Sequence, residues 1–343
     1  MRKLLNTLFV TTADAYTSLE GENVVVQQGG NEMARFPLHT LENIVTFTYP
    51  GASPALMGAC AKQNINLCFF SPNGRFLART TGEASGNVLL RRTQYRIADD
   101  ISSSCRIARN MIFGKVYNSR WSIERTMRDN ALRVDTQKLQ NASSLLQNAL
   151  PQIKDTEDLE RLRGLEGETA AVYFSALDEM ILSNKDDFYF RGRNRRPPLD
   201  KVNALLSFAY ALLANDCAAA LEACGLDSFV GFLHRDRPGR YSLALDLMEE
   251  LRACMADRFV ITLINNKIVN GQDFADRESG AVILTSDGRK KLIKAWQERK
   301  RDTITHPYLK EKIHWGLVPY IQALLLARYL RDDLDGYPPF LWK

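Results

Sequence analysis

The sequence predicts an α+β fold in which a β-rich region precedes a larger helical domain. Short runs of β-branched and aromatic residues, separated by turn signals, fill residues 1–80. From about residue 88 the apolar residues recur with helical spacing over long stretches. Between the two regions, residues 81–87 begin Thr-Gly-Glu-Ala-Ser-Gly, a composition typical of a linker. We therefore expect domains at 1–80 and 88–343, joined by a linker at 81–87.

The first domain alternates predicted strands with tight turns. Glu20–Asn23 predicts one turn, and Pro72–Gly74 predicts the turn of a hairpin. Ser53–Lys62 fits the one helix of this domain, with Ser53 as its N-cap. The predicted strands are Leu5–Val10, Tyr16–Leu19, Val24–Val26, Met33–Phe36, Ile44–Tyr49, Asn66–Phe70 and Arg75–Arg79. No cluster of titratable side chains here indicates chemistry.

The second domain is predicted to be almost entirely helical. A small hairpin is expected at Asp273–Leu284, between two of the helical stretches. The predicted amphipathic stretches are 88–118, 120–150, 156–184, 200–223, 242–262, 286–301 and 315–332.

The composition describes a mildly basic globular protein. The formal net charge is +5, which is compatible with a nucleic-acid partner but does not require one. The six cysteines form no Cys-x-x-Cys pair, so we interpret them as reduced thiols of a cytoplasmic protein. No apolar run approaches the roughly 18 residues of a membrane span, and we expect no membrane partner.

Glu166 interrupts the apolar stripe of a predicted helix, four residues from Leu162 and from Ala170. A carboxylate that faces a core needs a cation, a metal ion or several donors. The flanking Gly164 and Gly167 weaken a helix, and close approach of a ligand or another backbone is one reason to keep them. A metal ligand and a salt bridge to an arginine explain this segment equally well.

His234 precedes a Pro-Gly turn and is expected at a helix end or in a loop. Arginines next to a potential metal ligand suit a phosphate substrate, and those around His234 are Arg235, Arg237 and Arg240. We interpret the other three histidines, His39, His306 and His314, as structural or exposed.

An acidic pair follows on the next predicted helix, for which Ser242 is the expected N-cap. Asp246 and Glu249 are three residues apart and share one face. Alone they would be a solvated acidic face. Together with Glu166 and His234 they complete a set of hard ligands with one imidazole, which suits Mg²⁺ or Mn²⁺.

Residues 188–196 contain four arginines and three aromatic residues. Arginines bind backbone phosphates and aromatic rings stack on unpaired bases, so this stretch is a candidate DNA-binding loop. The following Pro197-Pro198 excludes a helix before Asp200. A solvated basic loop is the alternative. The arginines are Arg191, Arg193, Arg195 and Arg196.

Several segments, in order, resemble the CRISPR-associated spacer-acquisition integrases, the first of the Cas proteins. Leu162–Gly167 resembles the family's Gly-x-Glu-Gly metal-ligand segment. Arg195–Leu206 is similar to the stretch that leads into its central helix, and Gly231–Leu251 to its histidine and acidic-helix region. Gly86–Tyr95 resembles the junction into its helical domain, and Tyr329–Trp342 the end of its subtype I-C branch.

The resemblance implies a β-sandwich-like N-terminal domain that helps to form a homodimer, followed by an all-α catalytic domain. It implies a metal-dependent endonuclease and integrase that inserts protospacer DNA into a CRISPR array by 3′-hydroxyl attack on a phosphodiester. Glu166, His234 and Glu249 match the family's catalytic metal ligands. Many members have aspartate at the third position, so Asp246 can share or replace that role. Asn203 and Asp246 are otherwise expected beside the ligands.

The implied partners are double-stranded and partly single-stranded DNA and the second CRISPR-associated acquisition protein. Two other functions fit the same residues. A structure-specific metal-dependent nuclease acting in DNA repair would share the site. A non-catalytic DNA-binding scaffold would need the arginines but not the acids, and chelation of metal would not affect it.

Overall fold

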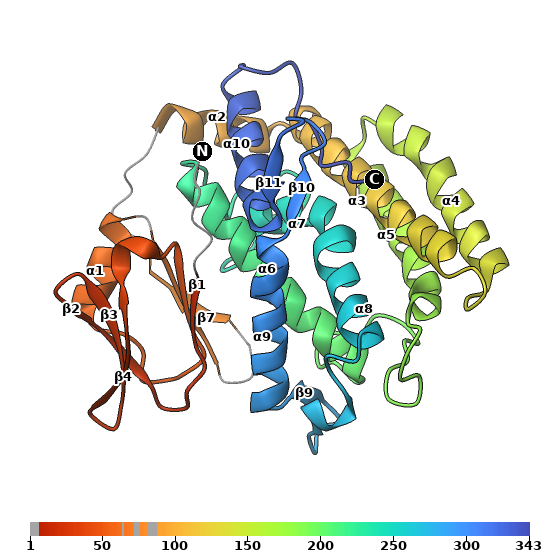
Figure 1. Cartoon of the computed structure of the whole chain (residues 1–343). Coiled ribbons are helices and arrows are strands. Elements are labelled where there is room, and N and C mark those ends of the chain that lie inside the picture. The colour runs from red at the N-terminus through yellow and green to blue at the C-terminus, as the bar shows by residue number, and fades with distance from the viewer. Residues whose placement is uncertain (1–6, 64, 72–75, 81–87) are drawn as a thin grey trace. The chain divides into compact units, whose positions relative to one another are not determined.

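The computed structural model describes residues 7–63, 65–71, 76–80 and 88–343, which form two compact units (Figure 1). The first unit contains the residues up to 86 together with 284–301, and the second contains 87–283 and 302–343. Residues 284–301 thus group with the strands and not with the predicted 88–343 domain. The predicted linker, the start of the first strand and the turn at Pro72–Gly74 lie outside the described residues.

The first unit contains two sheets. An antiparallel sheet has the order β2 (Tyr16–Glu20), β3 (Asn23–Gln28), β4 (Asn31–Pro37). In the other sheet β1, β5 and β6 are parallel and β7 is antiparallel to β6. Its order is β1 (Thr7–Val10), β5 (Asn43–Thr46), β6 (Asn66–Phe70), β7 (Phe76–Arg79). A short 3₁₀ turn, Leu38–Thr40, precedes β5.

One apolar cluster joins the two sheets. It contains Val24 of β3, Ile44 of β5 and Leu67 of β6, all fully buried, together with Leu56 of α1 (Pro54–Lys62). Ser53 accepts a hydrogen bond from the Leu56 N–H, which confirms the predicted N-cap. The sandwich-like arrangement expected for this unit is present because both sheets bury one face in the same core. The helix α9 (Ser286–Arg301) completes the unit.

The second unit is mainly helical, as predicted. Its α-helices are α2 (Val88–Asp99), α3 (Ile101–Asp129), α4 (Thr136–Asp155), α5 (Leu159–Ala176), α6 (Lys201–Ala223), α7 (Ser242–Leu251), α8 (Arg258–Asn265) and α10 (Val318–Leu330). A π-helical segment, Arg252–Asp257, joins α7 to α8. The remaining short turns are Leu177–Met180, Gly271–Asp273 and Trp315–Leu317.

Aspartate N-caps mark where four helices of this unit begin. The predicted stretch 88–118 is two helices, because Asp100 caps α3 by accepting the Ser103 N–H. α3 then continues to Asp129, beyond the predicted break at 119. Asp135, Asp158 and Asp200 cap α4, α5 and α6 in the same way.

The prediction of an all-α second domain needs one correction. Two small antiparallel sheets interrupt the helices in the described chain. The hairpin expected near 273–284 is formed by β8 (Phe274–Asp276) and β9 (Val282–Leu284). The pair β10 (Thr303–Thr305) and β11 (Lys312–His314) was missed, since three-residue strands leave almost no alternation to detect.

The core of the helical unit places the segments that carry the candidate ligands. α3 packs against α4, α5 and α7, and α6 packs against α7 and α10 (Figure 1). α6 is long and apolar enough to cross a membrane by composition, but 67% of its most apolar window is buried within the protein. It is therefore best described as the core helix against which α7 is packed.

Candidate active site

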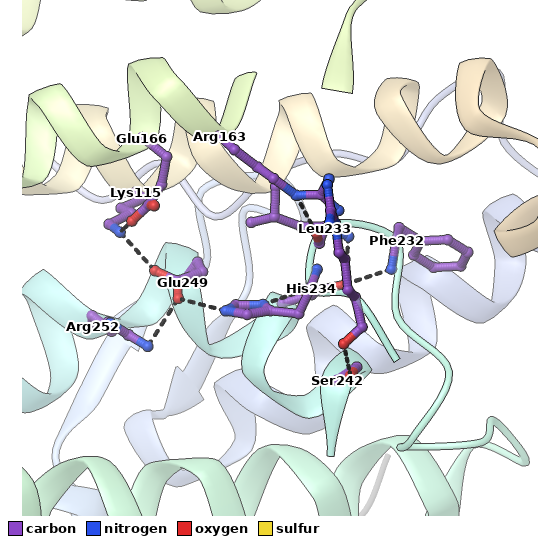
Figure 2. A network of polar contacts seen from close by, with 11 residues as sticks. Lys115, Arg163, Glu166, Phe232, Leu233, His234, Ser242, Glu249 and Arg252 are labelled. Carbon is purple, nitrogen blue, oxygen red and sulfur yellow. Dashed lines mark hydrogen bonds and ion pairs between the residues drawn. The ribbon is translucent and has the colours of Figure 1, made fainter. Parts of the chain in front are cut away.

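The three segments predicted to carry the ligands converge in the helical unit (Figure 2). Glu166 lies on α5, Glu249 on α7, and His234 in the loop between α6 and α7. His234 Nε2 lies 3.9 Å from Glu249 Oε1. Glu249 is 2% exposed, whereas the Glu166 side chain is 29% exposed. Glu166 therefore lies at the edge of the core and gives the site its opening to solvent.

A lysine that the sequence analysis did not select joins the two glutamates. Lys115 on α3 forms ion pairs with Glu166 Oε1 and with Glu249 Oε2, the latter at 2.8 Å (Figure 2). It can reach both because α3 packs against α5 and α7. Lys115 is 8% exposed and lies on the buried face of α3, four residues after the fully buried Met111. A lysine on an apolar helical stripe is the signal that could have identified it.

Opposing effects decide the charge of Glu249. Burial alone would raise the pKa of its carboxyl group, but the neighbouring Arg252, Lys115 and His234 outweigh burial and lower the pKa to about 2. Arg252 Nη2 lies 2.9 Å from Glu249 Oε1. Arg252 begins the π-helical segment, a rare conformation that occurs often at functional sites. Glu249 is thus a buried carboxylate that remains ionised.

Asp246 holds the imidazole of His234 in place. Its carboxylate accepts hydrogen bonds from the backbone N–H groups of Phe232, Leu233 and His234 at 2.6, 2.9 and 3.0 Å. Its Oδ1 also lies 2.6 Å from His234 Nδ1. The carboxylate can only accept, so Nδ1 carries a proton that points at it and Nε2 is the ring nitrogen that faces Glu249. Asp246 is therefore fully engaged within the protein, whereas Glu249 faces Glu166 across Lys115.

Gly231 allows the loop to wrap around Asp246. A Cβ atom at this position would lie 2.7 Å from Asp246 Oδ2 and 2.9 Å from the Ser242 backbone. The predicted capping role of Ser242 is wrong: Tyr241 precedes the first turn of α7 without a side-chain cap. The Ser242 hydroxyl instead donates to the Arg235 carbonyl at 3.3 Å, which anchors the loop that carries His234.

The arginines selected from the sequence differ in their surroundings. Arg193 is held inside the protein: its guanidinium donates to Asn203 Oδ1 at 2.7 Å and to Ser207 Oγ at 3.1 Å, and lies over the Tyr210 ring. Asn203 is fully buried and also donates to the Gly192 carbonyl at 2.8 Å. Arg193 and Asn203 therefore hold the 191–200 loop together from within the protein.

Four other arginines gather near the site. Arg195, Arg196 and Arg237 are exposed and Arg240 is half-buried. Burial, and then the like charges of Arg237, Arg195 and Arg196, lower the pKa of Arg240. Such repulsion indicates a cluster that attracts an anionic ligand. Of the remaining two, Arg235 pairs with Glu160 at 2.8 Å, and Arg191 is exposed over the Tyr189 ring.

The donor set fits a divalent metal ion in its chemistry. Two carboxylates and one imidazole, with the imidazole oriented by a further carboxylate, are typical ligands of such ions. As the side chains stand, no group of three or more His, Cys, Asp or Glu residues in the described ranges could hold a metal ion. The position between Glu166 and Glu249 is taken by the Lys115 ammonium, so it is already a site that binds a cation.

The fold is shared with solved structures of other proteins. A casposase bound to an integration product superimposes with a TM-score of 0.83 at 22% identity, covering 99% of this chain and 95% of that one. A chain of a Cas6-RT-Cas1–Cas2 complex gives a TM-score of 0.81 at 20% identity, and the match covers 98% of this chain and 36% of that one. At these identities the likeness concerns the fold.

The chain belongs to the Cas1 family. The family model of CRISPR associated protein Cas1 matches residues 8–298. A CRISPR-associated endonuclease Cas1 of Chlorobaculum tepidum is 48% identical over 343 residues, which is the full length of both chains. The family predicted from the sequence segments is confirmed.

Proposed function

We propose that this chain is a metal-dependent DNA endonuclease and integrase that inserts protospacer DNA into a CRISPR array. The observation that carries the proposal is the convergence of Glu166, His234 and Glu249 from three separate segments beside a cluster of arginines. The 48% identical relative is named an endonuclease, and the casposase was solved with an integration product.

We assign the metal to the space between Glu166, His234 and Glu249, and Mg²⁺ or Mn²⁺ fits their oxygen and imidazole donors. The chemistry that such an ion would supply here is Lewis-acid activation of a phosphodiester and of an attacking hydroxyl group. Glu249 contributes a charge that persists throughout the physiological pH range, because its pKa is near 2. Asp246 keeps Nε2 of His234 directed toward the same space.

The arginine cluster positions the DNA backbone. Arg195, Arg196, Arg237 and Arg240 bring four guanidinium groups together, and guanidinium groups bind phosphates in a bidentate manner. A Cβ atom at Gly164 or Gly167 would meet no described atom within 4 Å, so this face of α5 is open beside Glu166. A strand can therefore approach the helix backbone closely at this point.

The chemistry needs no nucleotide cofactor. If water attacks the phosphodiester, the DNA is cut. If the 3′-hydroxyl of a protospacer attacks, one phosphodiester replaces another and the ends are joined. Since the exchanged bonds are alike, little net energy is required. The protein has to hold the phosphate and the attacking oxygen close together in the correct orientation.

The proposed partners are DNA, a second copy of this chain and the Cas2-type acquisition protein. The neighbouring structure that contains Cas2 favours the last of these. We also propose a cytoplasmic location, which suits six cysteines that all remain as free thiols.

The test is strand joining of a protospacer duplex to a plasmid that carries CRISPR repeats. We expect joined product with Mg²⁺ or Mn²⁺, none after chelation, and none from Glu166→Ala protein that retains its helical circular dichroism. Cutting without joining would favour the repair nuclease. DNA binding without any metal-dependent reaction would favour the scaffold. Normal joining by Glu166→Ala would overturn the proposed site.

A further inference from the structure

Lys115 differs from an ordinary surface lysine in its burial and in its partners. It is 8% exposed, and its ammonium group forms ion pairs with carboxylates of two different helices, Glu166 of α5 and Glu249 of α7. Lys138, by contrast, is 45% exposed at its side chain and pairs with a single glutamate, Glu179, among the described residues. An ammonium group that bridges two carboxylates stands where a small cation with oxygen ligands would stand.

The charges around this position balance without any added ion. Glu166 and Glu249 contribute two negative charges, and Lys115 and Arg252 contribute two positive charges. Asp246 is satisfied separately by three backbone N–H groups and the His234 ring. A divalent ion placed among these groups with Lys115 unmoved would meet two nearby cations. Binding of the ion and the present position of the ammonium group are therefore mutually exclusive.

We propose that Lys115 is a positioning residue that holds Glu166 and Glu249 together before the metal arrives, and that the metal displaces its ammonium group from the shared position. This inference depends on the metal site proposed above. In the absence of metal, Lys115 prevents repulsion between the two carboxylates. When the metal binds, it takes over that role, and the flexible lysine side chain leaves along the partly exposed side of Glu166.

If Lys115 and the metal compete for one position, the effect of Lys115 on metal affinity has a definite direction. A residue that competes with the metal lowers its affinity, so a neutral side chain of similar length should raise that affinity. A lysine that only supports the site would have the opposite effect, because its loss would disorder the ligands. The same substitution should destabilise the metal-free protein, since it leaves a buried carboxylate with fewer counter-charges.

The experiment measures Mn²⁺ binding to the full-length, chelator-treated protein by electron paramagnetic resonance of free Mn²⁺, together with melting temperatures. We expect Lys115→Met to bind Mn²⁺ at least about tenfold more tightly than the wild type. It should melt at a lower temperature without Mn²⁺ and gain more on adding it. Lys115→Arg, which can still bridge both carboxylates, should bind Mn²⁺ no more tightly than the wild type. Lys138→Met is the matched control and should change neither quantity.

Weaker or unchanged Mn²⁺ binding by folded Lys115→Met would overturn the proposal. If this variant folds only when Mn²⁺ is present, the result supports displacement, because the metal then replaces the missing charge. Failure of the underlying metal site looks different. In that case the wild type and Glu166→Ala would bind Mn²⁺ equally, whatever residue stands at 115.

Discussion

Two adjacent residues of α7, Glu249 and Glu250, place their carboxylates in environments of opposite kind. Both are buried, with 2% and 0% exposure. Burial raises the pKa of Glu250 to about 7, and the hydrogen bonds from Tyr337, Gln322 and the Phe340 N–H lower it only in part. For Glu249, the surrounding cations outweigh burial and the pKa falls to about 2. Burial alone therefore does not set the charge of a carboxylate; the charges of its partners do.

Glu249 and Glu250 differ because they lie on two sides of the contact between α3 and α7. On one side, which we call the catalytic side because it holds the proposed metal site, Lys115 of α3 meets Glu249. On the other side, a Cβ atom at the preceding Gly114 would touch Glu250 Cβ at 3.0 Å and Pro339 at 3.3 Å. We call residues 337–342 the C-terminal strap, since Phe340 and Trp342 are both tied to Asn118 of α3. The catalytic side is held by charges and the strap side by neutral hydrogen bonds and packing.

The largest difference is expected from removing the charge of each carboxylate in turn. Glu249→Gln should lower the rate of strand joining by at least about 10³-fold, because a metal ligand and its charge are lost. Glu250→Gln should stay within about tenfold of the wild type, because its environment holds hydrogen bonds and no cation. Single-turnover joining rates measure both effects, with circular dichroism as the control for folding. If Glu249→Gln and Glu250→Gln lowered the joining rate equally, the two sides of the α3–α7 contact would not differ in function.

The strap side also predicts a pH dependence of stability. His306 is fully buried and packs on Phe340, and burial lowers its pKa from 6.5 to about 4. Well above pH 6.5, the His306 imidazole is neutral in both the folded and the unfolded state, so its full contribution to stability is present. As the pH falls from 6.5 through 4, the unfolded state binds the proton first, and the stability that His306 contributes decreases by up to about 3 kcal/mol.

Because the raised pKa of Glu250 favours folding over the same pH range, the contribution of His306 is measured as the difference between the wild type and His306→Asn. In urea unfolding at pH 7.5, 6, 5 and 4, the free energy of unfolding of the wild type should fall relative to that of His306→Asn, which keeps an acceptor for the Leu309 N–H. His39→Asn is the matched control. The same pH profile for His306→Asn and the wild type would show that this histidine does not contribute.

A smaller effect is expected at Gly231 on the catalytic side. Gly231→Ala would force a methyl group against Asp246, whose carboxylate orients His234. Disturbing such an orienting group typically costs about 10–100-fold in metal affinity or activity. Mn²⁺ titration and joining rates measure it. Gly58→Ala, at an exposed helical position with no atom nearby, should leave both unchanged and stabilise the protein by about 0.5–1 kcal/mol.

The smallest effect is expected from Tyr337→Phe in the strap. The substitution keeps the buried ring but removes the hydroxyl group that donates to Glu250 and accepts from Gln322. The free energy of unfolding should fall by about 1–2 kcal/mol while the joining rate stays near that of the wild type. Tyr308→Phe, at an exposed tyrosine, is the control. If Tyr337→Phe instead impaired joining at unchanged stability, the strap would belong to the catalytic side.

Part of the candidate site was predictable because its signals are local. A carboxylate on an apolar stripe identified Glu166, and a histidine among arginines before a Pro-Gly turn identified His234. Two acids on one helix face left Asp246 and Glu249 as alternatives. The contacts of Arg193 with Asn203 and Tyr210 were not predictable, because an arginine in a basic loop looks the same in the sequence whether it meets phosphate or is held by other side chains.

The sequence by itself determined the α+β class, the change from strands to helices, and the segments that carry the ligands. Hydrophobic periodicity and short motifs involve residues that are close together in the sequence, so they can be recognised without knowledge of the fold. Only the tertiary structure decided which carboxylate faces the cations and which meets the C-terminal strap. Lys115 and Glu166 are 51 residues apart, and Glu250 and Phe340 are 90 apart. Such pairs depend on how whole helices pack, and no local pattern specifies that packing.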